Sequence, residues 1–334
     1  MRLSQVPEDR IVLLLGAPRS GTTWLGKILD THPQVLYRFE PDRAHRAAHL
    51  PLICPPARVA DFQDAAKEYL RELLGVRALP VAGTQPAFRK FYRPRVLGRP
   101  RDAWIRLLRR VMRRQRKLRR WLRRRRIPDL IPAWRRGKLR PVIKSVAARG
   151  RAGLFAAAMP EARIIFLVRD PFGYVAAMLR GTRTGRHHGA VRVEELLATE
   201  QARAFGLTPQ MFDTMSMVER FAWDWAILNR KALDELEGRG NVRVVSYQDL
   251  VTNPIAVCRD LFAFLDLDWT QATEEFLRSS QDYQGRDPYL RLFRNTRRNA
   301  NAWRAELNGE DQQRILRVAQ AASLWQFCPS IDPS

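Results

Sequence analysis

The chain has 334 residues, of which 46% are hydrophobic and 28% charged, a composition typical of a packed globular protein and not of a disordered one. Its formal net charge of +25 at pH 7 favours anionic partners such as a nucleotide, an acidic glycan or an anionic lipid. No stretch approaches the roughly 20 apolar residues that span a bilayer, and the polar start is unlike a signal peptide, so we expect a cytoplasmic protein without a membrane anchor. The three cysteines, Cys54, Cys258 and Cys328, are far apart, which is typical of a reducing compartment and gives no metal-binding pattern.

Short aliphatic runs and helical stretches alternate along the chain. The aliphatic runs predict five strands, at Ile11–Leu15, Val35–Tyr37, Pro141–Lys144, Arg163–Val168 and Asn241–Val245. Helices are predicted at Thr22–Leu29, Asp61–Leu74, Ala148–Met159, Met215–Glu237, Asn253–Leu265 and Gly309–Leu324. Strands that alternate with helices imply a parallel sheet covered on both faces. We therefore predict a single α/β domain over residues 1–334, with a central parallel sheet between two layers of helices.

Residues 41–140 depart from this alternation, and we interpret them as a helical, arginine-rich insertion within the domain. Between Arg106 and Arg126 thirteen residues are Lys or Arg and none is acidic. Apolar residues recur at helical spacing and predict one amphipathic helix, with Trp104, Leu108, Val111, Leu118 and Leu122 on its apolar face. Three interpretations of residues 104–126 stay open: a solvated charged helix, a surface that contacts an anionic membrane or glycan, and a nucleic-acid patch. The lack of an interleaved base-reading motif disfavours nucleic acid.

A glycine-containing loop joins the first predicted strand to the first helix, with the sequence Gly16-Ala-Pro-Arg-Ser-Gly-Thr-Thr23. In such a turn, main-chain N–H groups and a helix N-terminus surround phosphate oxygens. Gly16 and Gly21 have the spacing of the GxxxxGK[ST] loop of nucleoside triphosphate enzymes, but Thr22 stands where that motif requires lysine. A fixed cation lies inside the loop instead, at Arg19. The pattern predicts a phosphate-binding turn for a donor other than ATP.

The ten residues from Gly16 to Leu25 resemble the 5′-phosphosulfate loop of sulfotransferases that use 3′-phosphoadenosine 5′-phosphosulfate (PAPS). Arginine at position 19 is similar to the carbohydrate and bacterial branches of that family. The resemblance implies a P-loop-like fold and a metal-free transfer of a sulfuryl group from PAPS to a hydroxyl or amine. It also implies that the 5′ side of the nucleotide is bound by Arg19, Ser20, Gly21, Thr22, Thr23 and Trp24.

A second segment, Phe166-Leu-Val-Arg-Asp-Pro171, is similar to the element that binds the 3′-phosphate in the same family. Arg169 would end a strand at the carboxyl edge of the sheet, where ligands of open α/β sheets bind. The family usually has a serine eight residues after this arginine, and here that residue is Ala177, so a neighbouring hydroxyl or arginine would have to replace it. The alternative for Arg169 is a local ion pair with Asp170 at the start of a helix near Gly173.

Two further segments resemble the family. Ser246–Leu250 is similar to its Tyr-Glu-Asp-Leu segment, which we interpret as structural: a strand end, a turn and a helix start. Asn299–Arg304 is similar to its Trp-Arg element, and Arg297 or Arg298 just before it is either a 3′-phosphate contact or a solvated surface residue.

Three residues are candidates for the chemistry of transfer. A carboxylate can remove the acceptor's proton, and Glu40 follows a predicted strand in a turn that resembles the Glu-Pro turn near the acceptor in related enzymes. Arg19 is permanently charged, so its role would be electrostatic stabilisation of the leaving oxygen. Lys144 ends a strand where several relatives place a lysine that points at the sulfuryl group. His45 and His49 are alternative bases.

Two other functions stay open. A P-loop phosphotransferase is disfavoured by Thr22, and a non-enzymatic polyanion-binding protein would use the basic segment on the same scaffold. The acceptor class is not specified by any pattern in the insertion, so a glycan, a lipid and a small alcohol all remain candidates.

Overall fold

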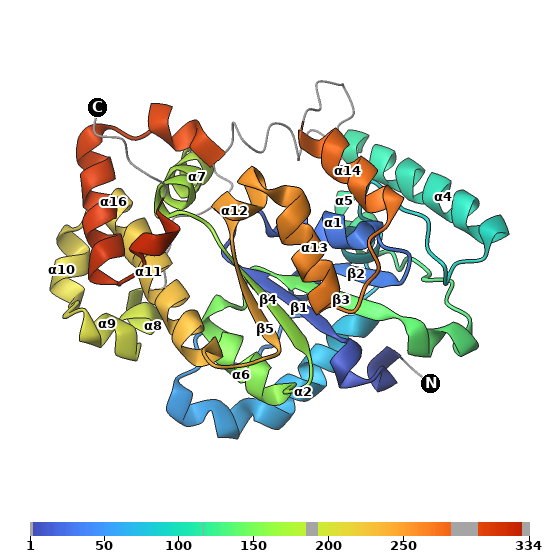
Figure 1. Cartoon of the computed structure of the whole chain (residues 1–334), viewed down its shortest axis with the longest axis horizontal. Coiled ribbons are helices and arrows are strands. Elements are labelled where there is room, and N and C mark those ends of the chain that lie inside the picture. Colours follow the sequence, from blue (N-terminus) through green and yellow to red (C-terminus); the bar gives the residue numbers. More distant parts are fainter. Residues whose placement is uncertain (1–2, 116, 185–192, 282–299, 329–334) are drawn as a thin grey trace.

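Five parallel strands form the centre of the protein (Figure 1). The computed structural model describes residues 3–115, 117–184, 193–281 and 300–328. Within them the strand order is β2-β3-β1-β4-β5. The strands are β1 (Val12–Gly16), β2 (Val35–Phe39), β3 (Arg140–Ser145), β4 (Arg163–Val168) and β5 (Val242–Ser246). Each neighbouring pair is parallel, which confirms the predicted α/β class.

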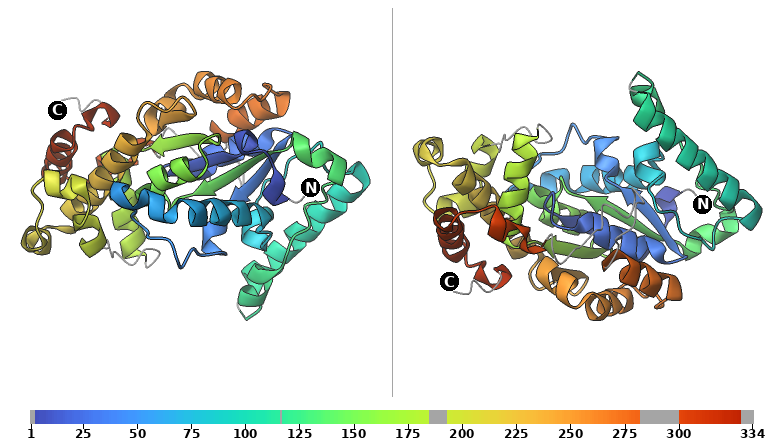
Figure 2. Two further views of the ribbon diagram at one scale, coloured as in Figure 1. Left: turned by 90° about the horizontal axis from the view of Figure 1, so that it is seen from below. Right: turned by 90° about the horizontal axis from the view of Figure 1, so that it is seen from above.

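Helices cover both faces of the sheet, and the views at right angles to Figure 1 show the three layers (Figure 2). Leu13 and Leu15 of β1 face one layer, whereas Val12 and Leu14 face the other, as the two-residue period of a strand requires. The first layer holds α2 (Val59–Gly75), α6 (Ala152–Ala158), α7 (Pro171–Arg183), α11 (Met217–Leu236) and α16 (Gly309–Ala321). The second holds α1 (Thr22–Thr31), α12 (Tyr247–Thr252), α13 (Pro254–Phe264) and α14 (Gln271–Gln281).

Local sequence signals account for where the main helices begin. Ser216 and Glu219 form a capping box, in which each side chain accepts from the main chain of the other residue, and α11 starts directly after Ser216. Asp170 accepts a hydrogen bond of 2.5 Å from the Gly173 N–H, and Pro171 has no N–H to leave unsatisfied. Helix α7 therefore begins at Pro171, two residues before the predicted start. Three short helices, α8 (Val193–Leu197), α9 (Glu200–Ala204) and α10 (Pro209–Thr214), form a small separate cluster with part of α11.

The segment between β2 and β3 contains α2, α3 (Leu79–Ala82), α4 (Arg95–Arg114) and α5 (Arg119–Arg124). Helix α2 belongs to the main core, whereas α4 projects from the edge of the domain (Figure 2). The prediction of one amphipathic helix over 104–122 is wrong, because α4 ends at Arg114 and α5 begins at Arg119. The junction concentrates like charges without an acidic residue to compensate them, which destabilises a continuous helix.

The buried face of α4 also differs from the predicted one. Ile105 packs with Leu79 and Ile127, and Leu108 and Met112 lie against the same cluster. Trp104 is instead 39% exposed. The predicted stripe was therefore correct for Leu108 and for Leu122, which is 2% exposed, but not for Trp104 or for Leu118, which is 43% exposed.

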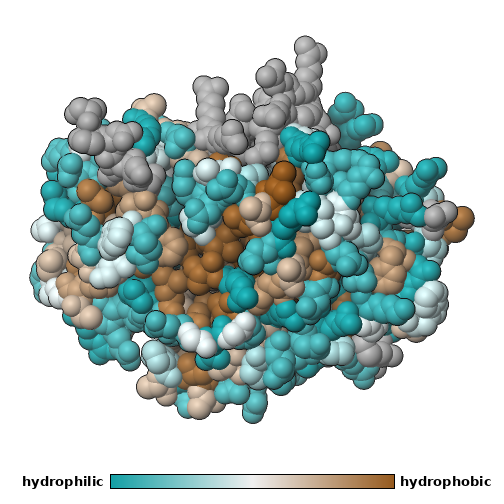
Figure 3. All heavy atoms as spheres, viewed as in Figure 1, coloured by the Kyte–Doolittle hydropathy of each residue, from teal (hydrophilic) through white to brown (hydrophobic). Residues whose placement is uncertain are grey.

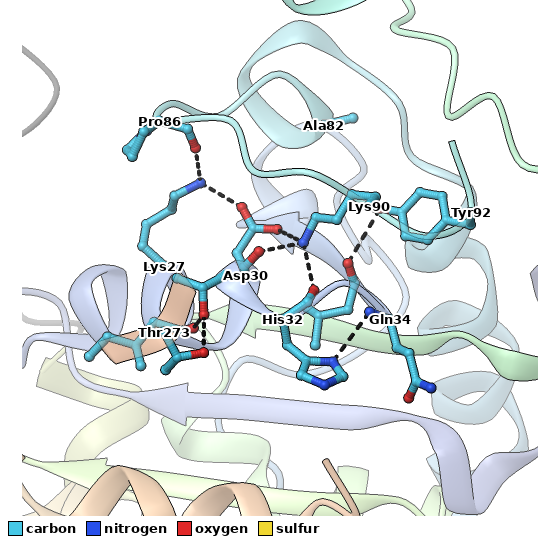
Figure 4. Close-up of polar contacts among 12 residues, drawn as sticks. Lys27, Asp30, His32, Gln34, Ala82, Pro86, Lys90, Tyr92 and Thr273 are labelled. Atoms are coloured by element: carbon cyan, nitrogen blue, oxygen red, sulfur yellow. Dashed lines mark hydrogen bonds and ion pairs between the residues drawn. The ribbon is translucent and has the colours of Figure 1, made fainter. Parts of the chain in front are cut away.

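A buried polar cluster fixes the insertion to α1 (Figure 4). Asp30 on α1 receives Lys27 Nζ at 2.5 Å and Lys90 Nζ at 2.8 Å, and all three side chains are buried. Lys90 also donates to the main-chain oxygen of His32 at 3.1 Å. Charges taken out of water require such pairing, so these contacts hold residues 86–90 against the helix that begins at the glycine-containing loop.

On the face seen in Figure 1, hydrophilic residues dominate the surface, and apolar residues gather across its centre over β4 and β5 (Figure 3). Strand β5 is the edge strand on this side, and its Val244 is 44% exposed.

Candidate functional site

The loops after β1 and β4 meet at the carboxyl edge of the sheet. Strands β1 and β4 are neighbours, but α1 packs on one face of the sheet and α7 on the other. The two chains therefore separate as they leave the strands. This is the switch point at which open α/β sheets form a ligand-binding crevice.

The glycine-containing loop, residues 16–23, is held in a tight turn by its two glycines. A Cβ at Gly16 would lie 2.5 Å from the main-chain oxygen of Leu167, and a Cβ at Gly21 would overlap the Tyr247 ring. Gly21 has a φ of 88° and Arg19 a φ of 69°, both in the left-handed region. The turn leads into the N-terminus of α1, where the first N–H groups have no partners within the helix.

The side chains of this loop differ in exposure. Ser20 is fully buried, and its Oγ has no hydrogen-bond partner among the residues that the structure describes. Arg19 is exposed, Thr22 is buried and Thr23 is partly buried. Trp24 lies in the core, where its Nε1 donates to Ser280 Oγ at 3.0 Å. A buried hydroxyl without a partner is uncommon, so Ser20 marks a position where a polar ligand atom would be accommodated.

Arg169 links the two loops directly. Its Nη1 donates a hydrogen bond of 2.8 Å to the main-chain oxygen of Arg19, and its guanidinium lies 5.0 Å from the centre of the Tyr247 ring. Its main-chain oxygen accepts from Trp225 Nε1 at 2.8 Å. Gly173 leaves room for the guanidinium, since a Cβ there would lie 2.6 Å from Arg169 Nε. The Arg169 side chain is therefore packed rigidly beside the first loop.

Arg169 also forms the local ion pair that the sequence left open as its alternative role. Asp170 Oδ2 lies 3.6 Å from Arg169 Nε, so an ion pair and the contact with the first loop coexist. Burial raises the pKa of the Asp170 carboxyl. Ala177 is buried within α7. Arg297, Arg298 and Asn299 lie outside the described residues.

Glu40 and Lys144 lie together at the ends of neighbouring strands. Lys144 Nζ donates to Glu40 Oε1, and the Glu40 N–H donates to the Lys144 main-chain oxygen at 2.8 Å. Glu40 Oε2 faces Arg43 Nε at 2.6 Å. Burial lowers the pKa of the Lys144 ammonium. Arg43 lies three residues after Glu40 in the same turn, so this ion pair was an alternative role for Glu40 that the sequence left open, and the structure contains it.

Glu40 lines a cleft of about 1300 Å³ between the end of β2, the C-terminal end of α2, and α3 with the chain around α5. His45 also lines this cleft, but its Nε2 lies 2.8 Å from Glu72 Oε2. The His49 ring packs edge-on against Tyr69, with ring centres 6.5 Å apart. Of the three candidate bases, Glu40 is the one in contact with Lys144.

Tyr247 is the residue at this site whose role sequence reasoning missed. Its segment was interpreted only as structural, yet its ring lies against both Gly21 and Arg169. Tyr247 is the first residue of α12. The position of that helix over the glycine-containing loop depends on packing between segments that are distant in the sequence. Local sequence carries no signal for such a contact.

Two further properties concern the described residues as a whole. No helix among them is long and apolar enough to cross a membrane. In the same residues, no group of three or more His, Cys, Asp and Glu side chains is arranged to hold a metal ion.

A sequence model identifies the family of the chain. The sequence model of the sulfotransferase family matches residues 12–271. Among solved structures, the chain is similar to the sulfotransferase domain from the curacin biosynthetic pathway, with 15% identity, coverage of 94% of this chain and 97% of that one, and a TM-score of 0.46. It is also similar to the sulfotransferase domain of the Synechococcus PCC 7002 olefin synthase, with 16% identity, 94% of each chain covered and a TM-score of 0.43. A Mycobacterium avium sulfotransferase has 16% identity over 94% of this chain and 77% of that one, with a TM-score of 0.44. No curated protein sequence is significantly similar. The family match extends over most of the chain, including both loops and Glu40, and the chain belongs to the sulfotransferase family.

Proposed function

We propose that the chain transfers a sulfuryl group from PAPS to a hydroxyl or amine of an acceptor. The observation that carries this proposal is the contact between Arg169 and Arg19, because it joins two loops that each resemble one end of a PAPS site. Membership of the sulfotransferase family supports the reaction type, and it disfavours a phosphotransferase and a purely structural polyanion-binding protein.

The residues of the crevice fit a nucleotide with two anionic ends. Ser20 offers a buried hydroxyl that has no partner among the described residues, and the Gly21 turn precedes the N-terminus of α1, which favours negative charge. Arg169 offers a buried guanidinium one loop away. We assign the 5′ side to residues 19–24 and the 3′ side to Arg169. PAPS, when bound there, supplies the sulfuryl group.

Glu40 is assigned as the base. Its Oε1 is held by Lys144, which leaves Oε2 as the atom that takes the proton of the acceptor hydroxyl. Arg43 forms an ion pair with Oε2, but its side chain is 65% exposed. Its movement into solvent therefore costs little free energy. The acceptor oxygen then forms a bond to sulfur as the bond from sulfur to the phosphate oxygen breaks.

Two cations balance the charge that moves during this step. Arg19 is exposed and permanently charged, and we assign it to the leaving phosphate oxygen. Lys144 has three N–H donors, of which one orients Glu40. We assign the remaining donors to the oxygens of the transferred group.

Ligand-induced thermal stabilisation tests the nucleotide assignment. We expect 3′-phosphoadenosine 5′-phosphate (PAP) to raise the Tm at micromolar concentration, and ATP to raise it much less. Stabilisation by ATP alone would instead favour a phosphotransferase, and stabilisation by heparin alone a polyanion-binding protein.

Glu40→Gln tests the base. It should lower kcat by about 10²–10⁴-fold and leave the Kd of PAP unchanged. Glu72→Gln is the matched control, because Glu72 lines the same cleft but is half-exposed and paired only with His45 in the described structure. Full turnover by Glu40→Gln would refute the base assignment.

A further inference from the structure

The cleft beside Glu40 has a strongly basic lining. Its volume of about 1300 Å³ exceeds the roughly 300–1,000 Å³ typical of pockets for small molecules. Five arginines contribute to its wall: Arg43, Arg77, Arg123, Arg124 and Arg126. The acidic residues of the wall are Glu40 and Glu72.

The acidic residues do not neutralise these arginines. Glu40 is paired with Lys144 and Arg43, and Glu72 with His45. The other four arginines, at 77, 123, 124 and 126, are exposed and have no ion pair with any residue that the structure describes. The wall opposite Glu40 therefore carries positive charge that the described part of the protein leaves uncompensated.

The main chain holds these arginines at a fixed place relative to Glu40. Ala78 and Arg126 form an antiparallel bridge, and the Ile127 N–H donates to the Arg77 main-chain oxygen at 2.7 Å. The Leu79 N–H donates to the Arg125 main-chain oxygen at 2.9 Å. The two basic segments, 77–79 and 125–127, are thus joined side by side.

A buried ion pair fixes the joined segments to the strand that ends at Glu40. Arg38 of β2 binds both carboxylate oxygens of Asp129, at 3.0 and 2.7 Å, and its Nε donates to the Leu74 oxygen at 2.8 Å. Arg38 lies two residues before Glu40, and Asp129 lies three residues after Arg126. The positive wall and the proposed base therefore belong to one rigid unit.

We infer that the acceptor carries an anionic group, a carboxylate, sulfate or phosphate, in addition to the hydroxyl or amine that is sulfated. This inference rests on the proposed function. The arginines at 77, 123, 124 and 126 would bind the anionic group, and the wall would hold the acceptor with its hydroxyl towards Glu40. Guanidinium groups suit all three anions because they bind them through paired N–H donors. An acidic oligosaccharide and a phosphorylated lipid headgroup share this chemistry, and the size of the cleft admits either.

The test measures binding of four probes to the PAP-saturated protein by isothermal titration calorimetry. A chondroitin sulfate tetrasaccharide is compared with neutral chitotetraose, and glycerophosphoinositol bisphosphate with neutral myo-inositol. The protein variants are Arg124→Ala/Arg126→Ala and, as a control of equal charge change, Arg239→Ala/Arg317→Ala, at two positions outside both α4 and the lining of the cleft. All four positions are exposed, so every variant should keep the Tm of the parent chain.

We expect an anionic probe to bind at least about tenfold more tightly than its neutral counterpart, and the cleft variant to lose at least about tenfold of that affinity. The control variant should lose far less. Tight binding of the tetrasaccharide would identify the acceptor as an acidic glycan. Tight binding of the inositol phosphate would identify it as a lipid headgroup. The inference is overturned if neutral probes bind equally well, if no anionic probe binds, or if both variants lose affinity alike. Failure of PAP itself to bind would refute the proposed function, which the calorimetric PAP titration reports separately.

Discussion

The guanidinium of Arg169 donates a hydrogen bond of 2.8 Å to the main-chain oxygen of Arg19. The two residues are 150 positions apart in the chain, and each lies in a loop that leaves the carboxyl end of a strand. The contact exists because β1 and β4 are hydrogen-bonded neighbours, with Gly16 opposite Leu167. Arg169 therefore both supports the first loop and presents charge beside it.

Arg169→Lys should raise the Kd of PAP by at least about tenfold, because an ammonium cannot reproduce the planar set of donors on a guanidinium. Fluorescence or calorimetric titration with PAP measures the change. Arg163→Lys is the matched control, since Arg163 starts the same strand at the opposite edge of the sheet. Equal PAP affinity in the parent chain and in Arg169→Lys would contradict the assignment.

Gly21→Ala should destabilise the fold and weaken PAP binding. The left-handed φ costs an alanine about 1–2 kcal/mol, and overlap with the Tyr247 ring adds about 1–3 kcal/mol. Gly206→Ala separates the two effects, because Gly206 has a φ of 67° and no atom near its Cβ position. Chemical denaturation should show a smaller loss for Gly206→Ala. Tyr247→Ala combined with Gly21→Ala should recover part of the difference, and no recovery would mean that the ring overlap is unimportant.

Asp129→Ala should lower the free energy of unfolding by about 3–5 kcal/mol, because it leaves the buried Arg38 guanidinium without its carboxylate. The exposed ion pair of Arg58 and Asp61 provides the comparison. Asp61→Ala should lower the free energy of unfolding by at most about 1 kcal/mol. Urea denaturation measures both. A loss below about 1 kcal/mol for Asp129→Ala would show that this pair does not fix the basic segments to β2.

Stability should fall as the pH is lowered from about 6.5 towards 4. Burial, and then the nearby Lys90, lower the pKa of His32 from 6.5 to about 4. Between these values the unfolded chain binds a proton that the folded chain does not, so unfolding becomes more favourable as pH falls. His32→Asn keeps an acceptor for the Gln34 N–H, now 3.2 Å from Nδ1, and should flatten the dependence of Tm on pH in this range. If the slope of Tm against pH is the same in His32→Asn and in the parent chain, groups other than His32 cause the loss of stability.

We propose that the exposed face of α4 contacts anionic membranes. Val96, Leu97, Trp104 and Leu107 are 80%, 48%, 39% and 55% exposed on a helix that carries many arginines. Membrane binding of such a helix is stabilised both by burial of its apolar side chains and by attraction of its arginines to anionic headgroups. Trp104→Ser should weaken sedimentation with phosphatidylserine-containing vesicles, whereas Trp325→Ser, an exposed tryptophan elsewhere, should not. Equal binding to vesicles of phosphatidylcholine alone would argue against the proposal.

Local sequence was enough to predict the sheet and the two loops. The five aliphatic runs became five strands whose bounds differ from the predicted ones by at most two residues, since the pattern of apolar side chains that forms a strand lies within each segment. The loop at Gly16–Thr23 was predictable because its backbone requires residues with little or no side chain at particular positions. Arg169 was predictable because a strand in a parallel sheet delivers its last residue to the carboxyl edge.

The tertiary structure decided how distant segments share charge. Glu40 and Lys144 were each named from sequence, but their contact depends on the neighbouring positions of β2 and β3. The pairing of 77–79 with 125–127 likewise required the packing of Ile127 and Asp129 against the domain. Desolvation and charge pairing act between residues that are close in space, whereas periodicity acts along the chain, so the strands and loops could be inferred from the sequence and the basic cleft could not.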